Sequence, residues 1–347
     1  MSNERPPPKR WRLSLGRAAL AGSLVLFIFI ATCYVRRFDG CAAITVFPAW
    51  AWLIPGLSLA VVQRWLHKDR LVLAAAALWL LLPLLFADAP ASLLRGAWRT
   101  LRPTKSAEAA RPIRVVTLNC AGSVQAAAEA GVLQPDILLL QESPSASQLE
   151  SLCEDLYGGE GQILWGPDCS ILVRSEVTPV VSPASKRGQC VLARVRLASG
   201  IEVAVASLRL HPVPLRLDLW SPDCWRGYTE NRRRQRRQLQ AIVKDATSHS
   251  GASSLILGGD FNAPAGDPVF DSLPPELRDA FREAGVGWGN TIVNDWPFHR
   301  IDQIWAGSRL RVITVHAKTT NHSDHRMVVG EFVVDSTGSV GQIDGDK

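Results

Sequence analysis

Several patterns that identify well-known chemistries are missing from this chain of 347 residues. It contains no GxxxxGKS and no GxGxxG, so nothing supports nucleotide binding by a P-loop or by the glycine-rich turn of a dinucleotide-binding fold. Its seven cysteines have no CxxC spacing, which excludes a zinc ribbon and a thioredoxin-like motif. No internal repeat is visible either. Disulfides remain possible for a domain outside the cytoplasm, but their pairing cannot be read from sequence.

Long apolar runs are present, and they are confined to the N-terminal quarter. Three uncharged segments occur there: Ala18–Val35, Ala42–Val62 and Leu71–Ala87. Each is close to the roughly 20 residues that a helix needs to cross a bilayer. Three in succession predict a retained membrane anchor of three helices. A buried soluble helix is the alternative for any single segment, and a signal peptide is the alternative for the first.

The distribution of basic residues predicts the orientation of this anchor. Arg and Lys precede the first segment and also lie between the second and third, which favours the cytoplasm for both positions. Basic residues after the first and third segments, such as Arg36 and Arg95, argue the other way. We expect a multi-pass protein of the cell (inner) membrane whose large domain is extracytoplasmic. The net charge of +6 then reflects topology and anionic lipid more than substrate.

Composition divides the chain into regions. We expect a basic N-terminal tail (1–17), a three-helix anchor (18–87), a linker (88–112), a catalytic domain (113–334) and a disordered Gly, Ser and Asp-rich tail (335–347). In the linker, Leu94, Trp98 and Leu101 recur at helical spacing. This pattern predicts a short helix, either on the membrane surface or as a plain soluble linker.

From residue 113 onward the apolar runs become short. Nine of them have strand length and are rich in Val, Ile and Leu, with Gly, Pro or polar residues between them. Helical stretches intervene at 124–130, 147–157 and around 230–247. Continuously apolar strands indicate sheets that are buried on both faces. The predicted fold class is α/β or α+β, with mixed sheets covered by helices.

Polar residues capable of metal or phosphate chemistry stand at the ends of these runs. They are Asn119, Glu142, His211, Asp260, Asn262, Asp302, Asp324 and His325. Core packing does not explain why five or six buried strands should each finish in such a residue. Residues two apart in an extended chain point the same way, so the acid and the amide of GDFN face one spot. The set predicts one active site.

The chemistry of the set follows from the residue types. An acid at the end of an apolar strand, such as Glu142, is either paired or a metal ligand. A buried Asp302 needs a partner, and a histidine is the usual one. Oxygen ligands from Glu, Asp and Asn favour Mg²⁺ or Mn²⁺ over zinc. The bland alternatives are an Asx-rich turn for GDFN, a capped loop for SDH and a structural role for His211.

Six short motifs, in the order TLNC, QE, LRLHP, GDFN, RIDQI and SDH, resemble those of the endonuclease/exonuclease/phosphatase superfamily. The three expected spans and the polar helix near Glu230 resemble a membrane-anchored bacterial branch of it. The resemblance implies a four-layer sandwich of two mixed β-sheets flanked by helices. It also implies hydrolysis of phosphate esters with a divalent metal, Mg²⁺ or Mn²⁺.

The resemblance further implies a metal end of the site. Glu142 would hold the metal, with Asn119 and Asp324 close by. The metal would stabilise charge at the phosphate and at the leaving oxygen.

The remaining residues would form the phosphate end. His325, oriented by Asp302, would contact the phosphate or act as general base. Asp260 and Asn262 would position the water and the phosphate, and His211 would be a second phosphate contact or an acid. The sequence leaves open whether the aspartate of GDFN or the histidine of SDH activates the water.

We therefore expect a membrane-anchored phosphoesterase that acts on a phosphodiester, as a nuclease does, or on a phosphomonoester. The alternative within the superfamily is a lipid or polyol phosphate hydrolase. The alternative of another class is a membrane-tethered binding domain without catalysis, although the whole polar set is present. The expected partners are the membrane and a phosphate-ester substrate, either nucleic acid or a lipid headgroup. No protein partner is inferred.

Two nearby features leave the substrate open. Six adjacent positions on a helix point all the way round, so the basic run 232–237 is either a solvated face or, in part, a phosphate-binding surface. The loop 212–229 carries Trp220, Trp225 and Tyr228, which could insert into nucleic acid or cover a small substrate.

Overall fold

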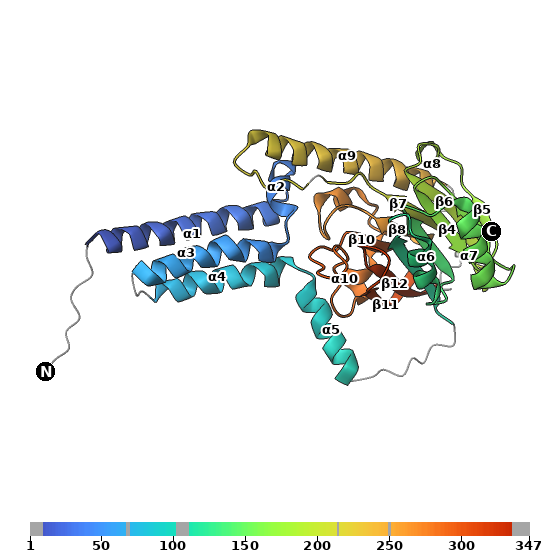
Figure 1. Ribbon diagram of the computed structural model, residues 1–347, viewed down its shortest axis with the longest axis horizontal. Coiled ribbons are helices and arrows are strands. Elements are labelled where there is room, and N and C mark those ends of the chain that lie inside the picture. The colour runs from blue at the N-terminus through green and yellow to red at the C-terminus, as the bar shows by residue number, and fades with distance from the viewer. Residues whose placement is uncertain (1–9, 67–69, 102–110, 214, 249–250, 335–347) are drawn as a thin grey trace, which may run out of the picture. The chain divides into compact units, whose positions relative to one another are not determined.

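The computed structural model describes residues 10–66, 70–101, 111–213, 215–248 and 251–334 (Figure 1). The chain divides into two compact units, Met1–Pro90 with Pro214–Arg232, and Ala91–Val213 with Arg233–Lys347. This division differs from the predicted regions in two places. Most of the expected linker helix belongs to the second unit, and a segment of the expected catalytic domain belongs to the first. The expected C-terminal tail (335–347) lies outside the described residues, as do parts of the N-terminal tail and the linker.

The first unit is built from apolar helices. They are α1 (Arg10–Arg36), η1 (Asp39–Cys41), α2 (Ala42–Thr45), η2 (Ala49–Trp52), α3 (Leu53–Leu66) and α4 (Leu71–Phe86). Within the described residues, α1 alone is long and apolar enough by itself to cross a membrane. Two further candidates are bent pairs: Asp39–Thr45 with Ala49–Leu66, bent by 73°, and Leu71–Phe86 with Ala89–Leu101, bent by 69°. The number of possible spans is therefore one, or up to three if each bent pair counts as one.

Pro48 explains why the expected second span is not one continuous helix, and Ala87 marks the end of the expected third span. Pro48 lies in the first break with ψ of 143°, and its ring removes the N–H that a continuing helix would need. Ala87 ends α4 in an extended conformation. The prediction of three uninterrupted helices is thus not confirmed. Close packing joins the helices, because Gly56 leaves space that the Trp79 ring fills.

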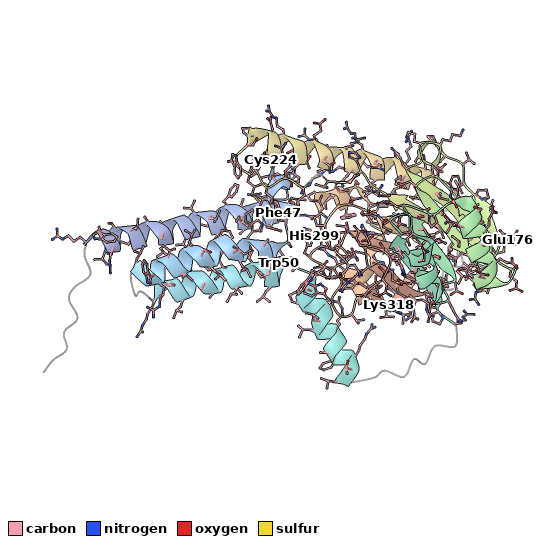
Figure 2. All side chains as sticks on the ribbon, in the orientation of Figure 1. Phe47, Trp50, Glu176, Cys224, His299 and Lys318 are labelled. Atoms are coloured by element: carbon pink, nitrogen blue, oxygen red, sulfur yellow. The ribbon has the colours of Figure 1, made fainter. Side chains whose placement is uncertain are left out.

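The start of helix α9 (Pro222–Thr247) also belongs to the first unit. Tyr228 packs against Phe47 with ring centroids 6.5 Å apart, and Trp225 lies 6.4 Å from Phe29 (Phe47 is labelled in Figure 2). Arg232 donates to the Phe38 carbonyl at 3.1 Å. Two aromatic side chains of the 212–229 loop are therefore engaged within the first unit.

Two six-stranded mixed sheets form the centre of the second unit (Figure 1). The strands are β1 (Ile113–Asn119), β2 (Ile137–Gln141), β3 (Gln162–Trp165), β4 (Cys169–Val173), β5 (Val177–Pro179), β6 (Cys190–Arg196), β7 (Glu202–Arg209), β8 (Leu255–Asp260), β9 (Arg278–Asp279), β10 (Asp302–Ala306), β11 (Leu310–Lys318) and β12 (Met327–Val334). The first sheet has the order β11-β12-β1-β2-β4-β3, and the second has the order β5-β6-β7-β8-β10-β9. The pairs β1–β2 and β7–β8 are parallel, and the other pairs are antiparallel.

Alternation along the strands produces four layers. In β2, Leu139 points into the core between the two sheets, where it meets residues such as Val205 and Ile304. Its neighbours Leu138 and Leu140 point the other way, towards α6 (Val124–Gly131) and α7 (Ala146–Tyr157). On the far side, α9 packs against the second sheet. The expected architecture of two mixed sheets flanked by helices is confirmed.

Five short elements of this unit were not expected from the apolar runs. They are β3, β5, β9, α8 (Pro183–Lys186) and α10 (Ala280–Ala284). The three strands lie at sheet edges, and β3 and β5 have mostly half-exposed or exposed residues. An edge strand needs no continuous apolar run because one side faces solvent.

Two glycines in β8 allow close approach of the neighbouring strands. A Cβ atom at Gly259 would lie 1.9 Å from the Leu208 carbonyl oxygen, and one at Gly258 would lie 2.4 Å from Leu139. The first contact is within the second sheet and the other is across the interface between the sheets. The glycines before Asp260 therefore bring the end of β8 close to β7 and to the first sheet.

Helix α5 (Ala89–Leu101) is attached to the second unit by two arginines. Arg95 donates to the carbonyls of Gly285 at 2.8 Å and Phe281 at 3.2 Å, and Arg99 donates to Ile313 at 2.9 Å. The apolar side chains Leu94 and Trp98 remain exposed. The helix is thus docked through its basic side, and its apolar side is open.

Candidate active site

The topology gathers the predicted residues at one edge of the two sheets. Asn119 ends β1 and Asp260 ends β8, while Asp302 begins the antiparallel strand β10. In the ladder, Asp302 is the direct partner of Asp260. Carboxyl ends of the parallel pairs and starts of their antiparallel neighbours meet at this edge, so the polar groups of distant segments come together.

The most deeply buried part of the site contains two acids and a histidine. His325 Nδ1 lies 2.9 Å from Asp302 Oδ2, and Asp302 has no exposed surface. Ligand atoms of Asp260, Asp302 and His325 all lie within 4.8 Å of one another. We call these three residues the buried cluster. Such an arrangement can hold a cation or move a proton.

Asn119 connects the buried cluster to Glu142. Its amide nitrogen donates to Glu142 Oε1 at 3.0 Å and to Asp260 Oδ2 at 3.1 Å. Asn262 also donates two hydrogen bonds to Asp260, one from its backbone N–H at 2.9 Å and one from its side-chain amide at 3.0 Å. Two amides therefore stabilise the carboxylate at the end of β8.

The surroundings raise the pKa values of both Asp260 and His325. Burial, and then the nearby charge of Asp302, raise the pKa of Asp260 to about 7. Burial alone would lower the pKa of His325, but the charge and hydrogen bond of Asp302, with two further acids, outweigh it and raise the pKa to about 9. Without a metal, the histidine is protonated at neutral pH while the acid is near its midpoint.

His211 lies apart from the buried cluster, on the side of α9. Its Nε2 is 3.0 Å from Arg234 Nη1, and its pKa is lowered by burial and then by the charges of Arg234 and Arg209. The imidazole is therefore neutral at pH 7 and accepts a hydrogen bond from the arginine. The His211 imidazole is positioned to contact an anion on this side of the site.

Asp324 is exposed, and its carboxylate makes no hydrogen bond or ion pair with the described residues. The neighbouring Ser323 fixes the loop instead. Its hydroxyl donates to the Asn119 carbonyl at 2.7 Å and accepts from the His325 N–H at 3.0 Å. The serine of SDH thus ties the histidine to the end of β1.

Arg209, which the sequence reasoning missed, is the main cation beside the acids. Its guanidinium lies 2.6 Å from Glu142, 3.4 Å from Asp168 and 3.7 Å from Asp260. A signal was available, because Arg209 stands two residues before His211 and alternate residues of a strand share a face. Asp168 was missed because it lies in a loop after the short edge strand β3, and not at the end of a predicted strand.

Two glutamines of α9 were also missed. Gln235 donates to the carbonyls of His211 at 2.8 Å and Asn262 at 2.9 Å. Gln238 accepts from the His211 N–H at 3.0 Å and donates to the Arg209 carbonyl at 2.9 Å. These side chains attach the helix to the strand ends and so fix the backbone that carries the site.

Backbone strain is concentrated at this edge. Ala121, Glu142 and Asn262 have φ values of 48°, 43° and 47°. They are three of the five non-glycine residues with positive φ in the described chain. Left-handed conformations cost energy for such residues and are retained where the surrounding structure requires a particular side-chain direction.

The donor set of the buried cluster fits a divalent cation. Asp302 Oδ1 is buried and has no hydrogen-bond partner among the described residues, which leaves one carboxylate oxygen available inside the site. The cluster offers two carboxylates and one imidazole. It differs from the predicted ligand set of Glu142, Asn119 and Asp324, and that set remains a prediction.

Comparison with known proteins agrees with this geometry. The model of the Endonuclease/Exonuclease/phosphatase family matches residues 116–325, and the chain belongs to this family. No curated protein matches the chain.

Solved structures of the same fold have low sequence identity. A mannosyl-6-phosphatase from Bacteroides thetaiotaomicron is 17% identical over 64% of this chain and 99% of its own, with a TM-score of 0.50. An endonuclease/exonuclease/phosphatase from Bacteroides vulgatus is 13% identical over 65% and 100%, also with 0.50. A further family protein from Bacteroides thetaiotaomicron is 16% identical over 65% and 96%, with 0.50. At these identities the similarity shows the fold alone.

The raised pKa of His325 predicts a pH-dependent stability of the metal-free protein. Its folded pKa of about 9 exceeds the ordinary 6.5, so the protonated imidazole stabilises the fold fully below pH 6.5, and this contribution is lost as pH rises through 9. We expect His325→Gln to cost roughly 3 kcal/mol at pH 6 and little at pH 10, measured by chemical unfolding of the full chain in detergent with EDTA. In an Asp302→Asn background most of this difference should vanish. An equal cost at both pH values would contradict the assignment.

Proposed function

We propose that this protein is a membrane-anchored, Mg²⁺- or Mn²⁺-dependent phosphoesterase that hydrolyses a phosphodiester or a phosphomonoester with an activated water. The observation that carries the proposal is the buried cluster, in which two carboxylates and a histidine meet at one edge of this fold. A lipid or polyol phosphate hydrolase is the alternative within the same class. Fold similarity by itself does not fix the substrate.

Two groups of acids at this edge support the metal requirement. The ion would be held by Glu142 with Asn119 and Asp324, as the sequence predicts, or by the acids of the buried cluster. When bound, it would supply positive charge to stabilise the negative charge that develops on the phosphate. Comparison of Mn²⁺ affinity between Glu142→Gln and Asp302→Asn separates these two placements.

The side chains of the chain itself divide the remaining work. Asp260, with a pKa of about 7, suits the general base that takes a proton from water, because a base is most effective when its pKa is near the working pH. His325, which Asp302 orients and keeps protonated, suits a contact to a phosphate oxygen. Asn262 would hold the water or the phosphate beside Asp260, and His211 would contact the phosphate from the other side.

The activity test is direct. The full chain in detergent should hydrolyse bis-p-nitrophenyl phosphate, or nick plasmid DNA, with Mg²⁺ or Mn²⁺, and EDTA should abolish the reaction. His325→Ala or Asp260→Ala should lower kcat by about 10² or more because each removes a group that acts on the reacting atoms. Lys244→Ala, an exposed change on α9, is the matched control.

Absence of activity on DNA, RNA, sphingomyelin and inositol phosphates would exclude the proposal and favour the non-catalytic binding domain. Activity that survives both substitutions would exclude the assigned roles.

The membrane placement is a further part of the proposal. We propose that the three expected apolar segments, which lie on α1, on α2 with η2 and α3, and on α4, span the cell (inner) membrane, and that the second unit is extracytoplasmic. The length and apolarity of α1 support the anchor. Fusions at Arg111 should be active with alkaline phosphatase and dark with green fluorescent protein, and the reverse pattern would place the domain in the cytoplasm.

A further inference from the structure

A pocket adjoins the site on the side of α9. It has a volume of about 430 Å³ and lies entirely within the second unit. Four segments line it: the loop before β4, the turn before β6, the end of β7 with the following loop, and α9. Arg209 and His211 line the pocket, and the same arginine contacts Glu142 at 2.6 Å, so pocket and site are continuous.

The charge of the pocket is strongly positive. Its lining includes Arg187, Arg209, Arg234 and Arg237, and Asp168 is the one acid in that lining. The charge of Arg209 is balanced by ion pairs with Asp168 and Glu142. The other three arginines make no ion pair with an acid of the described chain. Three positive charges are therefore available to a ligand.

The hydrogen bonds of α9 explain which residues of the basic run 232–237 face the pocket. Gln235 and Gln238 are hydrogen-bonded to strand ends, which fixes the rotation of α9. Positions 234, 237 and 241 follow at helical spacing, and all three line the pocket. Arg232 instead lies in the first unit. Part of the run therefore faces the pocket, while the rest of it points elsewhere.

Arginine is well suited to this use. Its planar guanidinium can donate two parallel hydrogen bonds to a phosphate, and it stays charged at every physiological pH. His211 also lines the pocket. Its neutral side chain accepts a hydrogen bond from Arg234 at 3.0 Å. The volume lies at the lower end of the range for small-molecule sites, which leaves room for a phosphate and part of its carrier.

We propose that this pocket binds a second phosphate group of the substrate, next to the ester that is cleaved. The inference rests on the proposed function for the cleavage itself. It defines the substrate class as an ester that carries a further phosphate nearby. A nucleotide with a neighbouring phosphate and a polyol with two phosphates both have this chemistry.

The test compares substrates that differ by one phosphate. With full-length protein in detergent and Mg²⁺, kcat/KM is measured for the p-nitrophenyl ester of thymidine 5′-phosphate with and without a 3′-phosphate. A second arm compares inositol 1,4-bisphosphate with inositol 1-phosphate. The wild type should prefer the doubly phosphorylated member of at least one pair by about tenfold or more. The arm that shows the preference identifies the source of the phosphate.

The double substitution Arg187→Ala with Arg237→Ala should bring that preference close to unity. Lys244→Ala, on the same helix but outside the pocket lining, should retain the preference. Unchanged thermal unfolding of the double variant verifies the fold. A wild type without preference in either arm, or a double variant that keeps the preference, would overturn the inference.

A binding measurement separates this inference from the proposed function. If none of the four esters is hydrolysed, equilibrium dialysis in EDTA tests the pocket independently of the phosphoesterase proposal. Thymidine 3′,5′-bisphosphate should bind about tenfold or more tightly than thymidine 5′-phosphate, and the double variant should lose the difference. Equal binding of both probes to the wild type would overturn the pocket assignment.

Discussion

The site depends on two buried carboxylates placed opposite each other. Asp260 and Asp302 are partners in the β8–β10 ladder, and both are almost fully buried. Two negative charges so close, in surroundings that solvate them poorly, cannot both be stable without compensation. One consequence is the pKa of Asp260, which burial and the charge of Asp302 raise to about 7. The other is that positive charge and hydrogen-bond donors must be supplied from elsewhere in the chain.

Neighbouring segments of the chain supply this positive charge and these hydrogen-bond donors. Asn119 and Asn262 donate to Asp260, and His325 balances Asp302. Arg209 lies among the remaining acids of the edge. The glycines of β8 allow this approach, and residues with positive φ stand at the strand ends. A divalent cation would complete the compensation, and it would also provide the charge that phosphate ester chemistry needs.

The sequence alone was sufficient to predict the features of the fold and the site that depend on local residue patterns. Runs of Val, Ile and Leu predict the central strands. The candidate site residues were found because each of them stands at the end of such a run. The edge strands were missed because they have no such run. The partners Arg209, Gln235 and Gln238 were not predicted, since their contacts join segments that only the fold brings together. The break in the expected second span was also missed, because hydropathy measures apolar length and not helix continuity.

The central claim is that this edge binds a divalent cation beside Asp260, either through Glu142 with Asn119 and Asp324 or through the buried cluster. Electron paramagnetic resonance of Mn²⁺ added to the full chain in detergent tests it without relying on turnover, with Asp260→Asn compared with the wild type. We expect bound Mn²⁺ that Mg²⁺ displaces, with affinity about tenfold or more lower in the variant, because the substitution removes negative charge next to either placement of the ion. The same Mn²⁺ affinity in both proteins, or no bound Mn²⁺ in the wild type, would contradict it.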